Sequence, residues 1–160
     1  MIRAVPQPLT HAAGRHLLLF DGYCGLCTTF VQFILARDPA GIFHFASLSS
    51  PEGRSAVSRH GGDPDDVSTV YVVADYQTPK ARPLTRGRAA LFVLGALGWP
   101  WKGATLFGVL PTGLLDRAYA LVARNRYRLF GRREQCLVPR AEWQHRFIDL
   151  RAPISDIAGD

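Results

Sequence analysis

The fold is decided by one stretch near the N-terminus, His16-Leu17-Leu18-Leu19-Phe20-Asp21-Gly22-Tyr23-Cys24-Gly25-Leu26-Cys27. Residues 17–20 form a short apolar run that stops at an Asp-Gly pair, as a fully buried strand does. The apolar residues that follow recur at the spacing of one helix face: Leu26, Phe30, Phe33 and Ile34. Pro39 ends that helix by Asp38, because the residue before a proline avoids the α region. The stretch therefore predicts a strand over 17–21, a tight turn, a Cys-x-x-Cys pair and a helix over 26–37.

This placement gives the two cysteines different chemistry. Cys24 lies where the helix begins, and there the unpaired N–H groups and the positive end of the helix dipole favour an anion. We therefore expect the pKa of Cys24 to be lowered and Cys24 to be the nucleophile. Cys27 lies one turn further in, close enough to form a disulfide with Cys24, and we expect it to be the more covered thiol. Such a pair exchanges disulfides, with Cys24 attacking and Cys27 resolving the mixed disulfide.

The same residues carry a family resemblance. Asp21-Gly22-x-Cys24-x-Leu26-Cys27 after an apolar strand resembles the DCC family of predicted thiol-disulfide oxidoreductases. A second block near the C-terminus resembles the same family: Pro111, Leu115-Asp116-Arg117, Tyr119, Arg124-Asn125-Arg126-Tyr127, Phe130-Gly131 and Cys136. The resemblance implies a thioredoxin-like fold and thiol-disulfide exchange activity, and it includes Asp21 with the cysteines.

The rest of the chain fits a thioredoxin-like sheet flanked by helices, with a C-terminal helical extension. We expect strands over 42–46 and 68–74, with a short partner strand between Pro79 and Pro83. The expected helices cover 51–60 after a Ser50 cap, 86–97 after a Thr85 cap, 104–110, 114–126 and 140–149. A thioredoxin-like fold usually carries a cis-proline just before its third core strand, but Val67-Ser68-Thr69 precede Val70 here. The loop that faces substrate is therefore expected to be built differently.

Length and composition set the class of protein. The 160 residues, 48% of them hydrophobic, predict a single domain over 16–150, with a loose arm over 1–15 and a tail over 151–160. Three cysteines are too few for a secreted disulfide scaffold, and the N-terminus lacks an apolar run of signal-peptide length. A reducing compartment, the cytoplasm, is the expected location.

Each candidate residue also has a plainer interpretation. Cys24 and Cys27, with Cys136, could hold zinc instead, but no other cysteine or histidine stands at the spacing of a zinc finger. Asp21 could be a turn-former before Gly22 or a carboxylate that accepts the proton of Cys27. Cys136 could be a buried small side chain or a third redox thiol.

Two surface features admit partners other than a disulfide. Five arginines stand within ten residues (Arg124, Arg126, Arg128, Arg132 and Arg133), and the net charge is +6. Such a run is usually a solvated face or pairs with Asp116 or Glu134, so a nucleic-acid role is the weaker interpretation. Trp99-Pro100-Trp101 splits the apolar stretches 89–97 and 104–110, so neither can span a membrane, although peripheral contact through Trp99 and Trp101 stays open. We expect these stretches to be two buried helices.

The sequence thus predicts a thiol-disulfide oxidoreductase that works without a bound cofactor or metal. Cys24 is the expected nucleophile, Cys27 the resolving thiol and Asp21 their proton partner. Its partners would be a disulfide-containing protein or a small thiol, with an electron donor that the sequence does not identify. Two other classes stay open: a zinc-binding module, and an adaptor whose basic helix docks a partner.

Overall fold

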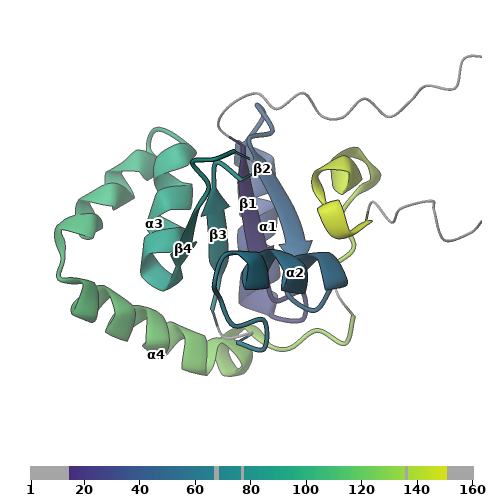
Figure 1. Ribbon diagram of the computed structural model, residues 1–160. Coiled ribbons are helices and arrows are strands. Elements are labelled where there is room, and N and C mark those ends of the chain that lie inside the picture. The colour runs from purple at the N-terminus through teal and green to yellow at the C-terminus, as the bar shows by residue number, and fades with distance from the viewer. Residues whose placement is uncertain (1–14, 67–68, 77, 136, 151–160) are drawn as a thin grey trace, which may run out of the picture.

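A four-stranded mixed sheet forms the centre of the computed structural model, which describes residues 15–66, 69–76, 78–135 and 137–150 (Figure 1). Its strands are β1 (His16–Phe20), β2 (Phe43–Ser47), β3 (Tyr71–Ala74) and β4 (Arg82–Thr85), in the spatial order β2-β1-β3-β4. β1 pairs with β2 in parallel, and the β1–β3 and β3–β4 pairs are antiparallel. The β-α-β-α-β-β-α order predicted from the sequence is confirmed.

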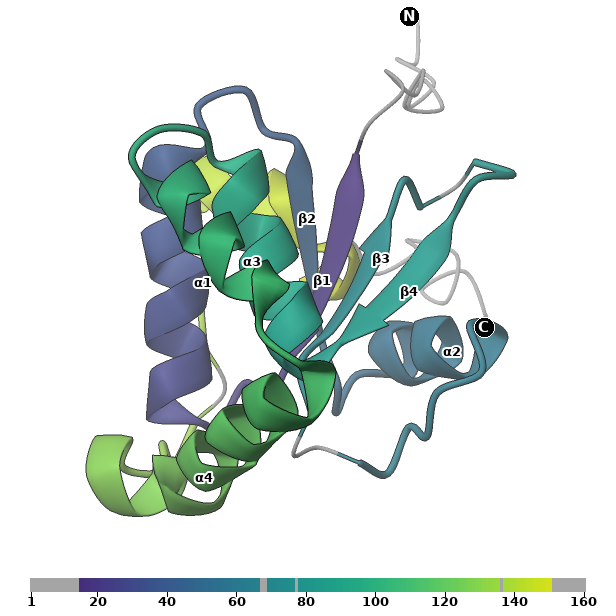
Figure 2. The ribbon, with the colours of Figure 1, turned by 90° about the vertical axis from the view of Figure 1, so that its left-hand side faces the viewer.

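Helices cover both faces of this sheet. The α-helices are α1 (Gly25–Arg37), α2 (Pro51–Arg59), α3 (Arg86–Ala96) and α4 (Thr112–Phe130). Three 3₁₀ segments complete the chain: η1 (Trp101–Val109), η2 (Ala141–Arg146) and η3 (Ile148–Leu150). Figure 2 shows α1 and α3 on one face of the sheet and α2 on the other, with α4 crossing below the sheet at the end where α1 begins. The predicted thioredoxin-like layer with a C-terminal helical extension is thus the architecture observed.

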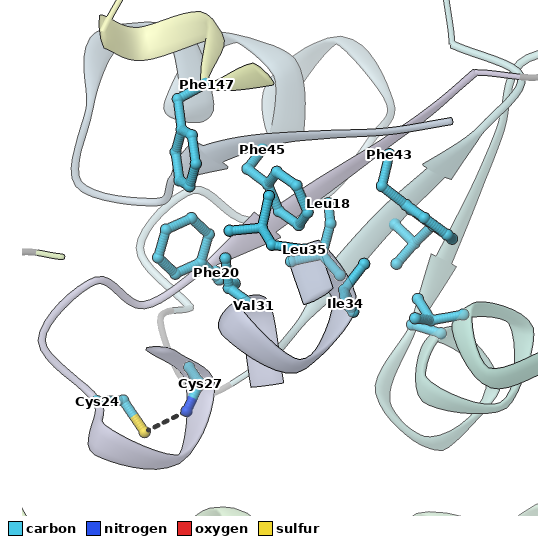
Figure 3. Close-up of a cluster of buried hydrophobic side chains, with 13 residues drawn as sticks. Leu18, Phe20, Cys24, Cys27, Val31, Ile34, Leu35, Phe43, Phe45 and Phe147 are labelled. Atoms are coloured by element: carbon cyan, nitrogen blue, oxygen red, sulfur yellow. Dashed lines mark hydrogen bonds between the residues drawn. The ribbon is translucent and has the colours of Figure 1, made fainter. Parts of the chain in front are cut away.

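The alternation of side chains along β1 builds two apolar cores. Leu18 and Phe20 point to the α1 and α3 side, where Val31, Ile34 and Phe45 are fully buried (Figure 3). Leu17 and Leu19 point to the other side and pack with residues that include Leu48 and Val57. Both cysteines belong to the first core, so the cysteine pair lies at the edge of a packed apolar cluster.

The segment after α4 closes the β2 edge of the sheet. Phe147 makes a parallel bridge with Phe45, and its ring stacks on that of Phe45 at 5.2 Å between centroids. Arg146 is buried and forms an ion pair with Asp38, which also accepts the N–H of Phe43 at 2.9 Å. The Nε of Arg146 donates to the Phe43 carbonyl at 3.0 Å. A buried charged network therefore holds the C-terminal extension to the core.

Several local predictions hold and others are wrong. Ser50 caps α2 by accepting the Gly53 N–H at 3.0 Å, as expected, whereas the side chain of Thr85 makes no capping bond to α3. On α1 the buried face includes Val31, Ile34 and Leu35, whereas Leu26, Phe30 and Phe33 are only half-buried. The helix expected over 140–149 is two short 3₁₀ turns, because Phe147 adopts extended backbone to bridge β2.

The prediction that residues 104–110 form a buried helix is also wrong. They belong to η1, a 3₁₀ segment in which no residue is buried. Leu106 is 75% exposed and Val109 is 84% exposed. The segment packs against α3. Side chains three residues apart line up on one side of a 3₁₀ segment. The side chains on the sides that do not face α3 therefore remain exposed.

Some expectations fall on residues that the structure does not describe. These are Cys136, the first residue (68) of the third predicted strand, nearly all of the arm over 1–15 and the tail over 151–160. In the described ranges no helix is both long enough and apolar enough to cross a bilayer.

Candidate active site

The cysteine pair sits at the start of α1, as the sequence predicts. Cys24 is the N-cap residue, with extended backbone, and its Sγ accepts the Cys27 N–H at 3.4 Å. The Asp21 carbonyl accepts the Cys24 N–H at 3.2 Å, which closes the turn between β1 and the helix. Both thiols are free rather than joined in a disulfide. The Cys24 sulfur therefore occupies the place at a helix N-terminus where an anion is favoured.

The exposure of the two thiols is the reverse of what we expected. Cys24 is 0% exposed and Cys27 is 7% exposed. The cover over Cys24 is the end of α4 and the residues after it. Gly131 O accepts the Gly25 N–H at 3.2 Å, and Arg132 forms an antiparallel bridge with Cys24 itself. The sequence could not reveal this cover, because it comes from a segment more than a hundred positions away.

Glycines make this close approach possible. A Cβ at Gly25 would stand 2.2 Å from the carbonyl oxygen of Phe130, well inside contact distance. At the other side Gly131 ends α4 with φ of +76°, a left-handed conformation that favours glycine. Arg133 then donates its N–H to the Tyr23 carbonyl at 2.7 Å. The chain after α4 thus runs beside the loop that carries the cysteines.

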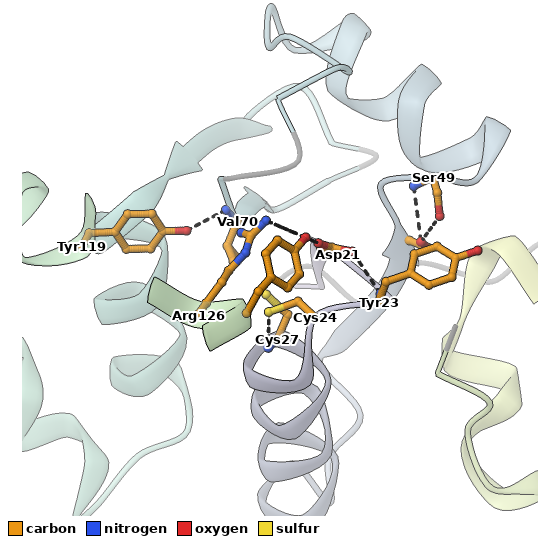
Figure 4. A network of polar contacts seen from close by, with 10 residues as sticks. Asp21, Tyr23, Cys24, Cys27, Ser49, Val70, Tyr119 and Arg126 are labelled. Carbon is orange, nitrogen blue, oxygen red and sulfur yellow. Dashed lines mark hydrogen bonds and ion pairs between the residues drawn. The ribbon is translucent and has the colours of Figure 1, made fainter. Parts of the chain in front are cut away.

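Asp21 is the centre of a buried polar network above the cysteines (Figure 4). Its Oδ1 accepts the Tyr23 N–H at 2.9 Å, so the turn-forming role is observed. Its Oδ2 accepts the hydroxyl of Tyr127 and lies 3.3 Å from the guanidinium of Arg126. Arg126 Nη2 also donates to the Tyr127 hydroxyl at 3.0 Å. Two neighbouring residues of α4 therefore hold one oxygen of the carboxylate that precedes the dithiol.

The five arginines of the basic run therefore differ in burial. Arg126 is 4% exposed and its charge is used inside the site, whereas Arg124, Arg128, Arg132 and Arg133 lie on the surface. In the described parts of the chain, none of the five forms an ion pair with Asp116 or Glu134. The expectation of a wholly solvated face is wrong for Arg126, because its guanidinium compensates the buried charge of Asp21.

The electrostatics of the site separate the two thiols. Burial, together with a smaller contribution from the neighbouring Cys24, raises the pKa of Cys27 to about 12. The charge of Arg126 acts in the opposite direction and Asp21 adds a smaller rise. Burial, with the hydrogen bond to Asp21, also raises the pKa of Tyr127, so its phenol stays protonated and donates. At neutral pH Cys27 is therefore a protonated thiol.

A side chain of α4 contacts the chain just before β3. The Val70 N–H, just before the strand, donates to the hydroxyl of Tyr119 on α4 at 2.9 Å. In the part of the chain that the structure describes, the single cis peptide bond is Trp99–Pro100, which belongs to the loop between α3 and η1. Side chains of α4 therefore contact both the residue before β3 and the carboxylate that precedes the dithiol.

The structure offers no preformed metal centre within the residues it describes. No group of three or more His, Cys, Asp or Glu side chains there is arranged to hold an ion. The zinc alternative would need Cys136, which lies outside the described ranges.

Comparison with known proteins agrees with this geometry. The sequence model of the DCC1-like thiol-disulfide oxidoreductases matches residues 18–132. The chain belongs to this family. It is 36% identical over 132 residues to the uncharacterized protein YuxK of Bacillus subtilis, an alignment covering 82% of this chain and 93% of the relative. It is 32% identical over 123 residues to a chloroplastic DCC family protein of Arabidopsis thaliana, covering 76% and 69% respectively. No solved structure matches the chain significantly.

The DCC1-like match contains the site residues that sequence reasoning had not singled out. Arg126 and Tyr127 stood in the second family block, but Arg126 was interpreted as part of the basic run, and neither residue was expected to contact Asp21. Their position in that block was the available signal. The match ends at 132, so Cys136 lies beyond it as well as beyond the described residues.

Proposed function

We propose that this DCC1-like protein catalyses thiol-disulfide exchange with Cys24 as nucleophile, Cys27 as resolving thiol and Asp21 as their proton partner. The observation that carries the proposal is the Cys24 sulfur at the N-terminus of α1, accepting the Cys27 N–H at 3.4 Å. A thiolate there is stabilised by the helix dipole and by that N–H. Substrates would be disulfides of proteins or small thiols, and the cytoplasm is the proposed location.

The first half of the reaction is attack on the substrate. The Cys24 thiolate attacks one sulfur of R–S–S–R′, forms a mixed disulfide with R–S, and releases R′–S⁻, which takes up a proton. The negative charge of Cys24 disappears in this step. Because that charge is one cause of the raised Cys27 pKa, forming the mixed disulfide lowers the pKa of Cys27.

The second half is resolution by Cys27. Its thiol must lose a proton before its sulfur attacks Cys24 and releases R–SH. Asp21 is the carboxylate that could take this proton, directly or through water. Arg126 and Tyr127 fix the carboxylate, and the charge of Arg126 offsets the repulsion between a carboxylate and a developing thiolate. The pair is returned to its reduced form by a separate thiol donor.

Trapping of the mixed disulfide tests the assignment of roles. Cys27→Ser keeps the size of the side chain but removes the resolving sulfur, so Cys24 should stay bonded to its substrate in a cell extract. Cys24→Ser should trap nothing, because attack never begins. Each variant is made alone and also combined with Cys136→Ser, so that a third thiol cannot resolve the intermediate. Non-reducing electrophoresis measures the adducts.

The same variants separate the competing class. A zinc-binding module predicts about one zinc per purified chain and equal damage from losing either cysteine. Absence of reducible, Cys24-dependent adducts in both the single and the double variants would end the oxidoreductase assignment.

A further inference from the structure

An apolar cavity of about 360 Å³ lies beside the dithiol and is partly open to solvent. It lies between α1, α3 and α4, and Cys27 forms part of its wall. Most of the wall is apolar and includes Leu26, Phe30, Leu91, Leu115 and Val122. A dry apolar cavity of roughly 150 Å³ is enough to bind benzene. This cavity therefore has room for an apolar group larger than one ring.

Polar side chains form only a small part of this wall. Apart from Cys27 they are Tyr119 and Arg126. The Tyr119 hydroxyl accepts the Val70 N–H, and the Arg126 guanidinium pairs with Asp21. A polar or charged group that lies against the apolar part of the wall would lose its hydrogen bonds to water without replacement. An occupant must therefore be uncharged and apolar where it contacts this wall.

The cover over Cys24 limits the size of the occupant. Cys24 is 0% exposed beneath the Gly131–Arg132 segment, so a folded protein cannot reach it in this conformation. Cys27 is in the wall of an open cavity and lies against Cys24. A small molecule can therefore reach Cys27 through the cavity while α4 stays in place, and the Cys24 sulfur lies behind it, 3.4 Å from the Cys27 N.

We propose that this cavity binds small, uncharged disulfides with apolar substituents, which the dithiol reduces. This inference rests on the proposed function and names its substrate class. The reaction balances as R–S–S–R plus two thiols giving the Cys24–Cys27 disulfide plus two R–SH. Cys24 breaks the S–S bond of the substrate, Cys27 releases the second thiol, and the two protons of the reduced pair leave with the two products.

A matched pair of disulfides tests the proposal in single turnover, where no electron donor is needed. Di-n-propyl disulfide and bis(2-hydroxyethyl) disulfide have the same number of heavy atoms and no charge, and they differ in polarity. The second-order rate at which each oxidises the reduced protein is measured and divided by its rate with free dithiothreitol. A methylene in a hydrophobic pocket is worth roughly 10–200-fold in selectivity, so we expect the propyl compound to be favoured at least about tenfold.

Two leucine substitutions on α4 locate the effect. Ala123 lines the cavity. In Ala123→Leu the ratio of the two normalised rates should fall to less than about a third of its wild-type value, because the added carbons fill the space. Ala120 does not line it, and Ala120→Leu should leave both rates unchanged. Propylbenzene, which has no sulfur, should slow oxidation by dipropyl disulfide in competition.

The outcomes are distinct. Equal normalised rates for the two disulfides, or an undiminished preference in Ala123→Leu, would overturn the cavity assignment and leave the exchange activity standing. Failure of both disulfides to oxidise Cys24 and Cys27 would instead contradict the proposed function itself.

Discussion

Gly25→Ala tests whether the end of α4 really covers the redox pair. A methyl group at position 25 would lie 2.2 Å from Phe130 O and 3.2 Å from Gly131 O. Because ordinary contact begins at 3.4 Å, the Phe130 carbonyl would have to retreat by about 1.2 Å. Backbone atoms cannot yield as a flexible side chain can, so the whole helix end must shift.

The expected size of the effect follows from three terms. Overpacking of this kind costs roughly 1–3 kcal/mol. Loss of the hydrogen bond from Gly25 N–H to Gly131 O costs about 0.5–1.5 kcal/mol. Alanine gains at most about 1 kcal/mol over glycine in a helix. With the full alanine gain subtracted, the free energy of unfolding should therefore fall by about 0.5–3.5 kcal/mol.

Urea unfolding and alkylation measure the two consequences. Loosening the cover by about 1–2 kcal/mol should raise the rate at which iodoacetamide labels Cys24 by roughly 5–30-fold. Gly113→Ala is the matched control, since Gly113 also lies in the first turn of a helix but a Cβ there meets nothing within 4 Å. If Gly25→Ala is as stable as Gly113→Ala and Cys24 is labelled equally slowly in both, the cover is not what buries Cys24.

Three further substitutions test other contacts. Arg146→Ala should lower the free energy of unfolding by about 3–5 kcal/mol, because Asp38 is left buried and uncompensated. The control Arg140→Ala, at an exposed ion pair, should change it by less than about 0.5 kcal/mol. Equal losses of unfolding free energy in urea titrations of the two variants would refute the buried pair. Burial lowers the pKa of His16 below 6.5, so its contribution to stability is complete above that pH and is lost as the pH falls. Urea midpoints should therefore decline below about pH 6.5 more steeply in the wild type than in His16→Phe, and parallel profiles would contradict this. Asp21→Asn keeps an oxygen for the turn but removes the base, and should slow resolution of the mixed disulfide by about tenfold or more in stopped-flow measurements; unchanged rates between about pH 6 and 9 would reduce Asp21 to a turn residue.

The sequence predicted the sheet and the start of α1 because those signals are local. The apolar run over 17–20, the Asp-Gly stop and the helical spacing after Cys24 each depend on neighbours in the chain. Alternation in β1 places its side chains on two faces, as the two cores confirm. The Ser50-Pro51 start of α2 was readable for the same reason.

The sequence could not predict what α4 does at the site. Arg126 looks like its neighbours in a basic run, and only the crossing of α4 over the loop brings it to Asp21. The burial of Cys24 likewise comes from residues 130–133, and no periodicity links them to the dithiol. Hydropathy also gave a wrong prediction of burial for Leu106 and Val109, because apolar residues in a 3₁₀ segment at the edge of a layer can remain exposed.

Equilibrium redox titration of the Cys24–Cys27 couple tests the central claim most directly. Reduced Cys136→Ser protein is equilibrated in glutathione or dithiothreitol buffers, and its remaining thiols are alkylated and counted by mass spectrometry. We predict one two-electron transition with a slope of about 30 mV per tenfold change and a midpoint between roughly −270 and −120 mV. The transition should vanish when either Cys24 or Cys27 is replaced by serine. Two thiols that stay reduced in the most oxidising buffer, or that oxidise only between chains, would contradict the account.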